Sequence, residues 1–366
     1  MLEWKVYDSN VIHVPFGLCA VPCGMAYTQT PLSHINGVLC RMKLINAVEQ
    51  FMEWRKRNGF AAPTNIQNAS NLRQFAIFMH NCDLEAVREQ DVLQYIAMLN
   101  DEFHLQPNGM IPKCNVLRQF FKYWNERDCG QFDYRAIPLP RKEFTMPRLC
   151  TKADFAKFWN AVAEYSTKPQ RVRNVALVSL IASTGIRNGE ACALRVDSLD
   201  CTAPVKIPTG GRKEVTMFRG VVKTEKSRGM RPFREIFWNE TVNAHLSHWL
   251  ERREELHKQR PFANPDFLFV GLNSPWANRG GWGAKMVPGS VDEIFTRYSR
   301  IAGVDINPHM LRHLLGRDMA EADASEHVIS DVLGHSRLDS SRIYTRLYGK
   351  AVGRQFNRFR GLHWKG

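Results

Sequence analysis

Residues 307–344 constrain the fold of this chain more than any other part of its sequence. Asn307 is a good N-cap residue, and Pro308 suits the first position of a helix because no intrahelical hydrogen bond is lost there. A helix that begins here places His309 and Arg312, three residues apart, on one face. The sequence therefore predicts a helix that presents a histidine and an arginine to a common target. The apolar residues available to bury its neighbouring face are Leu311, Leu314 and Leu315.

A second, shorter helix is predicted over residues 325–333, where apolar residues recur at helical spacing. Gly334 is a suitable C-terminal cap, because glycine adopts the left-handed backbone conformation readily. The turn that follows contains His335, and Tyr344 lies nine residues later. An arginine, two histidines and a tyrosine near helix ends indicate a site that binds an anion beside a nucleophile.

Two earlier segments extend this set. Residues 184–190 read TGIRNGE and present Arg187 after a glycine turn, and residues 221–228 read VVKTEKSR and fit a β-hairpin that contains Lys223. With the HMLRH and LGH motifs and the downstream tyrosine, their order and spacing resemble those of the tyrosine recombinases of the phage integrase family. The resemblance implies a catalytic set made of Arg187, Lys223, His309, Arg312, His335 and Tyr344.

The chemistry of these residues suits a phosphodiester. Arg187 and Arg312 have planar, permanently charged guanidinium groups that can bind the non-bridging oxygens. The phenol of Tyr344 has a reference pKa of about 10, so it needs help to lose its proton at neutral pH. His309 and His335 can accept that proton or hydrogen-bond the phosphate oxygens.

The family resemblance assigns protonation of the leaving 5′-oxygen to Lys223. Lys226 and Arg228 are near enough in the sequence to leave that assignment open. The product is then a 3′-phosphotyrosyl bond that keeps the energy of the broken bond, so no cofactor, metal ion or ATP is expected. His313 is expected to support or pack the site, and Tyr348 is the alternative nucleophile that the spacing from His335 disfavours.

Helical periodicity organises the first half of the chain. Apolar residues at helical spacing predict helices over residues 39–56, 68–79, 84–99 and 112–124, which form a small bundle. A basic, proline-rich linker at residues 136–148 follows. We expect a mainly α-helical protein with a small antiparallel β-sheet. The expected divisions are an N-terminal extension (1–29), a helical core-binding domain (30–143), a catalytic domain (144–348) and a C-terminal tail (349–366).

The beginning of the catalytic domain is dominated by one apolar stretch. Residues 175–181 are apolar almost all round, which predicts a central buried helix ending at Gly185. Glu190 follows Arg187 by three residues. It either orients that arginine or is a favourable negative charge at a helix N-terminus, and the sequence leaves both explanations open.

Charge indicates a polyanionic partner. The formal net charge is +14, and no acidic residue occurs from Arg342 to the end of the chain. Beside the predicted catalytic set, this favours duplex DNA over an ordinary solvated surface. The candidate DNA-binding residues are Arg118, Lys122, Arg141, Lys142, Lys226 and Arg228, with Lys56 and Arg57 as further candidates.

Cysteine use and hydropathy favour a reduced, cytoplasmic protein. Nine cysteines are scattered over the chain without a signal peptide, and no apolar run reaches the length of a membrane span. His13, Cys19 and Cys23 have metal-binding side chains, but no second close pair completes a tetrahedral site, so no metal is expected.

The expected function is site-specific recombination of duplex DNA at inverted-repeat core sites. The resemblance implies a homotetramer on DNA, and accessory proteins are an open question. A mobile-element integrase or transposase is the favoured role. The aromatic C-terminal tail is expected to dock on a neighbouring protomer. Two alternatives are a type IB topoisomerase that relaxes DNA and an inactive DNA-binding accessory protein.

Overall fold

The structure, a computed structural model, divides into two compact units at residues 144 and 145, and each unit is described by itself. It describes residues 42–129, 133–143, 145–146, 148–165, 169–208, 214–224, 232–272, 281–335 and 339–348. In the last range, the side chains described are those of residues 341–345. The predicted N-terminal extension, the C-terminal tail, Lys226 and Arg228 lie outside the described residues.

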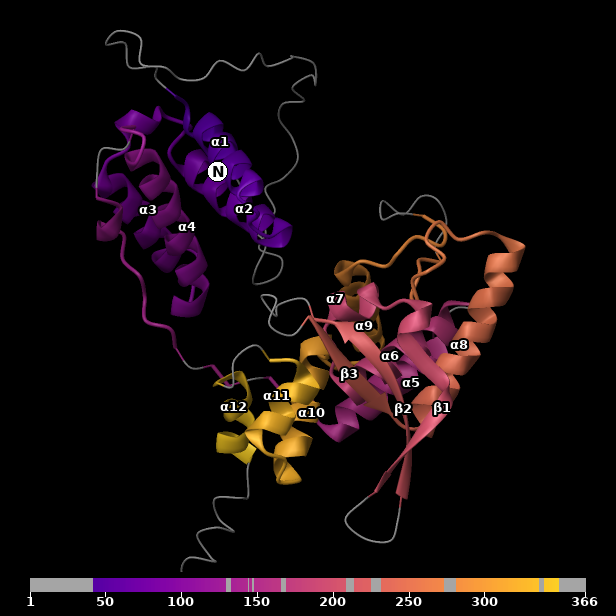
Figure 1. Cartoon of the computed structure of the whole chain (residues 1–366). Helices are drawn as coiled ribbons and strands as arrows, with labels where there is room; N and C mark the ends of the chain where they lie inside the picture. The colour runs from indigo at the N-terminus through magenta and orange to yellow at the C-terminus, as the bar shows by residue number, and fades with distance from the viewer. Residues whose placement is uncertain are drawn as a thin grey trace, which may run out of the picture. The chain divides into compact units, whose positions relative to one another are not determined.

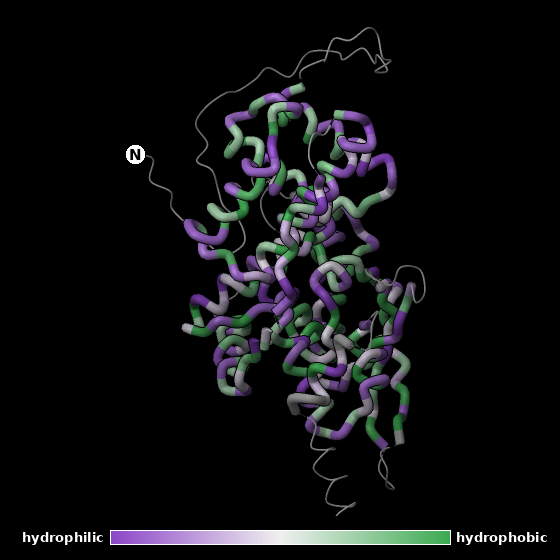
Figure 2. Tube along the Cα trace, turned by 90° about the vertical axis from the view of Figure 1, so that its left-hand side faces the viewer, coloured by the Kyte–Doolittle hydropathy of each residue, from purple (hydrophilic) through white to green (hydrophobic). Residues whose placement is uncertain are grey.

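The first unit contains a bundle of four α-helices (Figure 1). These are α1 (Leu44–Arg57), α2 (Ala62–Phe78), α3 (Glu89–Asp101) and α4 (Pro107–Asn125), with 3₁₀ turns η1 (Leu84–Ala86) and η2 (Tyr134–Ala136). They enclose an apolar core in which Phe51 meets Phe120 edge to face at 5.6 Å. Hydrophobic and hydrophilic residues alternate along these helices, as amphipathic packing requires (Figure 2). The four predicted helices are therefore present.

All four helices begin five or six residues away from the predicted starts, with α1 at Leu44 rather than residue 39 and α2 at Ala62 rather than residue 68. The single helix predicted over residues 84–99 is split, because the carboxylate of Asp91 accepts a hydrogen bond from the backbone N–H of Arg88 at 2.8 Å and starts α3 there. Helix α4 begins at Pro107 and contains Pro112 within it, whereas the prediction began the helix at residue 112. Proline favours the first turn of a helix, so Pro107 and Pro112 are both candidates for the start, and the helix begins at Pro107.

The second unit combines helices with one small sheet, which confirms the predicted fold class. The strands pair antiparallel in the order β1-β2-β3. No helix in the described part of the chain is long and apolar enough to cross a membrane. The elements are α5 (Lys152–Tyr165), α6 (Gln170–Thr184), α7 (Asn188–Ala193), η3 (Val196–Ser198), β1 (Leu199–Pro208), β2 (Glu214–Lys223), β3 (Phe233–Trp238), α8 (Glu240–Gln259), α9 (Pro288–Ala302), α10 (Pro308–Glu321), α11 (Glu326–Leu333) and α12 (Asp339–Tyr348).

Helix α6 is the centre of this unit, as its sequence predicted. Leu177, Leu180 and Ile181 are fully buried, and neighbouring residues of the helix belong to the same core. Gly185 ends the helix with a φ of 61°, a conformation that glycine adopts without steric cost. The chain then turns into α7, with Arg187 at the N-cap of that helix.

The sheet positions two residues near the ends of β2 and β3. In their register Val222 pairs with Arg234 and Lys223 pairs with Phe233. Because side chains alternate along a strand, Arg234 shares its face with buried Val222, while Lys223 points to the opposite face. Strand β1, which the sequence did not predict, pairs with β2 and has an irregularity between Asp200 and Val205.

The three C-terminal helices follow the predicted signals closely. The side chain of Asn307 accepts a hydrogen bond from the backbone N–H of Met310 at 3.0 Å, and Ser325 caps α11 in the same manner. Gly334 ends α11 with a φ of 62°. Helices α10, α11 and α12 pack together on the β3 side of the sheet (Figure 1). This arrangement brings Arg312, His335 and Tyr344 into one site.

Replacing Gly220 with alanine tests the packing of the sheet. A Cβ atom at Gly220 would lie 2.6 Å from Cδ2 of Leu199 and 2.8 Å from the backbone oxygen of Ser198. We expect Gly220→Ala to lower the free energy of unfolding of the second unit by about 1–3 kcal/mol, measured by chemical denaturation.

Gly109→Ala in helix α4 is the matched control, because the atom nearest to its new Cβ, in the side chain of Leu105, lies 4.0 Å away. It should stabilise the first unit by about 0.5–1 kcal/mol. Equal effects of the two substitutions would contradict the packing described for β1 and β2.

Candidate active site

Three arginines from three elements bind consecutive backbone carbonyls at the C-terminal end of α11. Arg234 Nη1 donates to the oxygen of residue 332 at 2.6 Å, and Arg187 Nη2 donates to that of residue 334 at 3.0 Å. Between them, Arg312 Nη2 donates to the oxygen of residue 333. The last carbonyls of a helix lack intrahelical partners and have a partial negative charge, which favours guanidinium groups there. The end of α11 therefore fixes the positions of Arg187 and Arg312.

Glu190 joins two of these arginines from the other side. It is fully buried and accepts hydrogen bonds from Arg187 Nη1 at 2.7 Å and from Arg234 Nη2 at 3.0 Å. It also accepts one from the backbone N–H of Arg187 at 3.0 Å. Burial raises its pKa, but the charges of Arg234 and Arg187 and that backbone hydrogen bond lower it overall. Both explanations of Glu190 apply, because it orients Arg187 and also caps α7.

Arg312 is the most deeply placed cation of the predicted set. It is 4% exposed, and its Nη1 donates to the backbone oxygen of Gly185 at 2.6 Å. Burial, followed by repulsion from Arg187, lowers its pKa to about 9, so it still has its charge at neutral pH. Since this repulsion is present without a ligand, an anion bound between the two arginines would relieve it.

Tyr344 lies under α10 and is 1% exposed. Its ring packs against Gly316, where a Cβ atom would lie 2.8 Å from the ring carbon Cζ. Its hydroxyl lies 2.7 Å from Nδ1 of His313, and its ring stacks on that of His335 with centroids 6.3 Å apart and planes 9° apart. The predicted nucleophile therefore contacts two histidines within its own chain.

His335 is held as a neutral imidazole. Its Nδ1 lies 2.8 Å from the hydroxyl of Ser341, which is fully buried. Burial, followed by the positive charges of Arg312 and Arg187, lowers the pKa of His335 to about 3. At neutral pH it can form hydrogen bonds but does not add a positive charge to the site.

His309 and Lys223 are both exposed, unlike the buried residues of this site. His309 is exposed in the first turn of α10, and its charge contributes to lowering the pKa of His313. Lys223 is exposed at the end of β2, next to the pair formed by Val222 and Arg234. Among the described residues, Lys223 makes no hydrogen bond or ion pair with the other five predicted catalytic residues. The structure thus gathers Arg187, Arg312, His335 and Tyr344, leaves His309 exposed in the first turn of α10, and turns Lys223 to the sheet face opposite Arg234.

The predicted DNA-binding residues of the first unit differ in how exposed they are. Arg118 donates from Nε to the backbone oxygen of Ile137 at 2.8 Å, so it holds the segment after η2. Lys122 is half exposed, with Glu126 at 3.8 Å, and Arg141 and Lys142 are exposed. Their role in binding DNA stays a prediction, as does that of Lys226 and Arg228.

Sequence analysis missed the role of Arg234 and the contact of His313 with Tyr344. Arg234 occupies an inward position of β3, on the same side as buried Ile236 and Trp238. A charge at an inward strand position requires a buried partner, and that signal was available. His313 had no comparable signal, because its partner Tyr344 lies 31 residues away.

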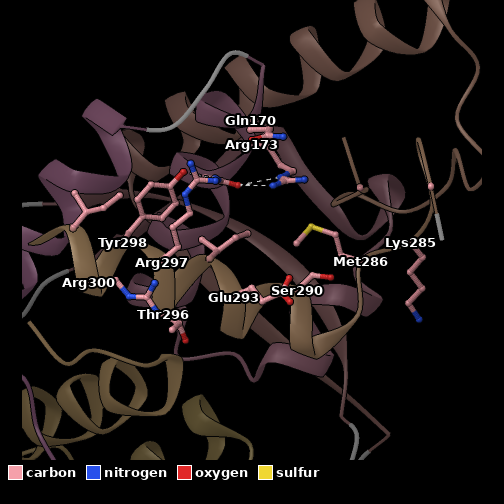
Figure 3. Close-up of a pocket in the computed structure, with 15 residues that line it drawn as sticks. Gln170, Arg173, Lys285, Met286, Ser290, Glu293, Thr296, Arg297, Tyr298 and Arg300 are labelled. Atoms are coloured by element: carbon pink, nitrogen blue, oxygen red, sulfur yellow. Dashed lines mark hydrogen bonds between the residues drawn. The ribbon is translucent and has the colours of Figure 1, made fainter. Parts of the chain in front are cut away.

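A separate cavity of about 790 Å³ lies between α6, α9 and residues 271 and 281–286 (Figure 3). Buried Arg173 projects into this region and donates to the oxygens of Asn174 and Val270. None of the six predicted catalytic residues lines the cavity. In the part of the chain that the structure describes, no group of three or more His, Cys, Asp or Glu side chains is arranged to hold a metal ion.

Comparison with known proteins matches residues 150–350 to the phage integrase family. The tyrosine recombinase XerC of Staphylococcus saprophyticus is 26% identical over 76% of this chain and 84% of its own length. The Tn1549 transposon integrase in complex with a circular intermediate DNA has a TM-score of 0.60 at 17% identity, over 87% of this chain and 99% of that one. The XerH site-specific recombinase bound to difH has a TM-score of 0.58 at 19% identity, over 82% and 81%.

The mainly helical fold with its small antiparallel sheet is that of the tyrosine recombinases, which are DNA strand-transferases. Since the family match covers more than half of the chain, the protein belongs to the phage integrase family.

Removing the charge of Arg234 tests the arginine network. Arg234→Met leaves Glu190 with one cationic partner and a helix carbonyl without its donor. We expect it to cost about 3–5 kcal/mol of unfolding free energy, as is typical when a buried ion pair loses one member. In a double-mutant cycle with Glu190→Gln, the coupling energy should be about 1–3 kcal/mol by chemical denaturation.

The control cycle uses Arg252 and Glu255, an ion pair in α8 with side chains 36% and 60% exposed. Its coupling should stay below about 1 kcal/mol. Additive effects of Arg234→Met and Glu190→Gln on the free energy of unfolding would show that these two buried side chains do not stabilise each other.

The buried histidine predicts a specific loss of stability in mild acid. An unfolded histidine has a pKa of about 6.5, whereas that of His335 is about 3. Between these values only the unfolded chain binds the proton, so stability falls as the pH drops below 6.5. From pH 7.5 to pH 5, the wild type should lose up to about 2 kcal/mol more than His335→Asn, which keeps a partner for Ser341. Equal losses by denaturant titration would refute the burial of a neutral imidazole.

Proposed function

We propose that this protein is a site-specific recombinase that cuts and rejoins duplex DNA through a 3′-phosphotyrosyl intermediate. The main support is the placement of Arg187 and Arg312 on consecutive carbonyls of α11, with Tyr344 packed beside His335 in the same unit. Two fixed cations and a phenol are the groups that a metal-independent displacement at phosphorus needs.

The arginines supply the binding of the phosphate. A guanidinium has five N–H donors, and Arg187 and Arg312 each use both Nη atoms on protein acceptors. The remaining N–H groups can bind the non-bridging oxygens, where negative charge increases in the transition state. Because the end of α11 holds both forks, with Glu190 on Arg187 and the backbone oxygen of Gly185 on Arg312, little reorganisation is needed. Loss of either fork typically costs about 3–4 kcal/mol of transition-state stabilisation.

Tyr344 supplies the attacking oxygen, and Lys223 protonates the leaving oxygen. The phenol attacks phosphorus, and the bond from phosphorus to the 5′-oxygen breaks. Lys223, on the exposed end of the hairpin, gives a proton to that 5′-oxygen, and His309 and His335 hydrogen-bond the phosphate. Since the phosphotyrosyl bond conserves the energy of the broken bond, a new 5′-hydroxyl can reverse the step. Tyr344 is 1% exposed, so DNA binding has to uncover the phenol first.

Duplex DNA is the proposed partner. The net charge of +14 supports this, as do the solved DNA complexes of the Tn1549 integrase and XerH. We propose that Arg118, Lys122, Arg141, Lys142, Lys226 and Arg228 contribute contacts to it. We further propose a homotetramer that pairs two inverted-repeat sites, which separates this function from simple relaxation of DNA.

The biological role is the most specific part of the proposal. Integration or transposition of a mobile element is supported by the fold likeness to the Tn1549 transposon integrase. Curated relatives named XerC favour recombination of chromosomal sites as the second candidate. The DNA that the protein selects discriminates these roles. Ends of a mobile element support the first, whereas a single chromosomal site supports the second.

Covalent capture of DNA tests the chemistry on a pool of sequences, so the target does not have to be chosen in advance. The wild type is incubated with nicked duplexes that have a randomised core, and the protein is denatured to recover linked DNA. We expect enrichment of defined sequences joined to Tyr344 through a 3′-phosphate, as mapped by peptide mass spectrometry. Cleavage close to the nick releases a short fragment that has the 5′-hydroxyl, and its loss prevents rejoining, so the adduct accumulates.

Tyr344→Phe should bind the selected duplex with unchanged affinity and give no adduct. Tyr348→Phe is the matched control and should retain the adduct. Absence of any linked DNA with the wild type would refute the proposed function. A plasmid with two selected sites then distinguishes recombination, seen as inversion or deletion, from relaxation of any plasmid.

A further inference from the structure

We propose that His313 is a further catalytic residue, which takes the proton of the Tyr344 hydroxyl as the phenol attacks phosphorus. This inference rests on the proposed function and assigns the base of that same reaction. The residues assigned by family resemblance leave the phenol without a specific base, because His309 and His335 were equal candidates. The contacts of Tyr344 distinguish these three histidines.

His313 contacts the reacting oxygen directly. Its Nδ1 lies 2.7 Å from the hydroxyl of Tyr344, within the reach required of a general base. The contact joins α10 to α12, which pack on one another. Gly316, one turn further along α10, has no side chain and so admits the tyrosine ring. Because α10 and α12 meet directly, His313 and Tyr344 can stay in contact while DNA binding uncovers the phenol.

The other two histidines are placed differently. His335 lies parallel to the face of the tyrosine ring at 6.3 Å, and its Nδ1 contacts Ser341. Its pKa of about 3 makes it a poor proton acceptor. His309 is exposed in the first turn of α10, on the side that faces Asp292 of α9 closely enough to influence the pKa of that carboxyl. The geometry therefore favours His313 as the base.

The surroundings keep His313 ready to accept a proton. Burial, followed by the positive charges of His309 and Arg312 on α10, lowers its pKa below the usual value. The charged and titratable groups facing it are therefore His309, Arg312, Tyr344 on α12 and His335 after α11. At neutral pH its imidazole is uncharged, and the tautomer with its proton on Nε2 presents the lone pair of Nδ1 to the phenol.

Every proton and bond of the reaction can be followed between Tyr344, His313, the phosphate and Lys223. The O–H bond of Tyr344 breaks and its proton moves to Nδ1 of His313, while the phenol oxygen bonds to phosphorus. The bond to the 5′-oxygen breaks, and that oxygen takes a proton from Lys223. In rejoining, the 5′-hydroxyl returns its proton to Lys223, and protonated His313 returns its proton to the departing phenolate.

His313→Asn separates proton transfer from positioning. The Oδ1 atom of asparagine occupies nearly the place of Nδ1, so it can accept the hydrogen bond but cannot take the proton. We expect single-turnover cleavage of the nicked duplex selected by covalent capture to slow by about 10²–10⁴-fold, with unchanged affinity for that duplex. A fluorinated tyrosine at position 344, whose phenol is more acidic, should restore much of the rate in this variant.

Two further variants complete the test. His327→Asn makes the same change at an exposed position of α11 and should leave cleavage unchanged. His313→Ala should regain cleavage when imidazole is added, which a purely structural residue does not predict. Cleavage by His313→Asn at or above the wild-type rate would overturn the inference, because His313 would then only hold the phenol. An absence of adduct in the wild type would instead overturn the proposed function.

Discussion

The binding of three guanidinium groups to the last turn of α11 is the interaction on which the rest of the site depends. Residues 332–334 offer three carbonyls without intrahelical partners, and Arg234, Arg312 and Arg187 each bind one of them. Like charges are thereby held in proximity, at a cost that the buried carboxylate of Glu190 and the negative helix end offset. The result is a preorganised concentration of positive charge suited to an anion.

Burial and nearby positive charge together set the protonation of the histidines around the site. Burial lowers the pKa values of His335 and His313 most, and nearby positive charges, that of Arg312 among them, lower them further, so the imidazoles near the nucleophile are neutral at physiological pH. Neutral imidazoles do not compete with the arginines for the phosphate, and His313, in contact with the phenol, is the one placed to accept its proton. The tyrosine lies on the far side of this arrangement, where a phenolate would be stabilised by Arg312. The same arrangement of charges therefore acts on both the phosphate and the phenol of Tyr344.

Local signals predicted those parts of the fold that depend on neighbours in the sequence. The caps at Asn307 and Gly334 and the buried run of α6 obey short-range steric and hydrogen-bond rules, and they appeared where the sequence placed them. Strand β1 and the role of Arg234 depend on partners far along the chain, and periodicity alone does not reveal such partners. The contact of His313 with Tyr344 is of the same kind, since only the packing of α12 on α10 creates it.

The most direct test of the account is the structure of the covalent complex with a captured nicked duplex. The account predicts a phosphate joined to the Tyr344 oxygen, with N–H groups of both Arg187 and Arg312 within about 3 Å of its non-bridging oxygens. A phosphate joined to a different residue, or one that contacts neither guanidinium, would contradict it.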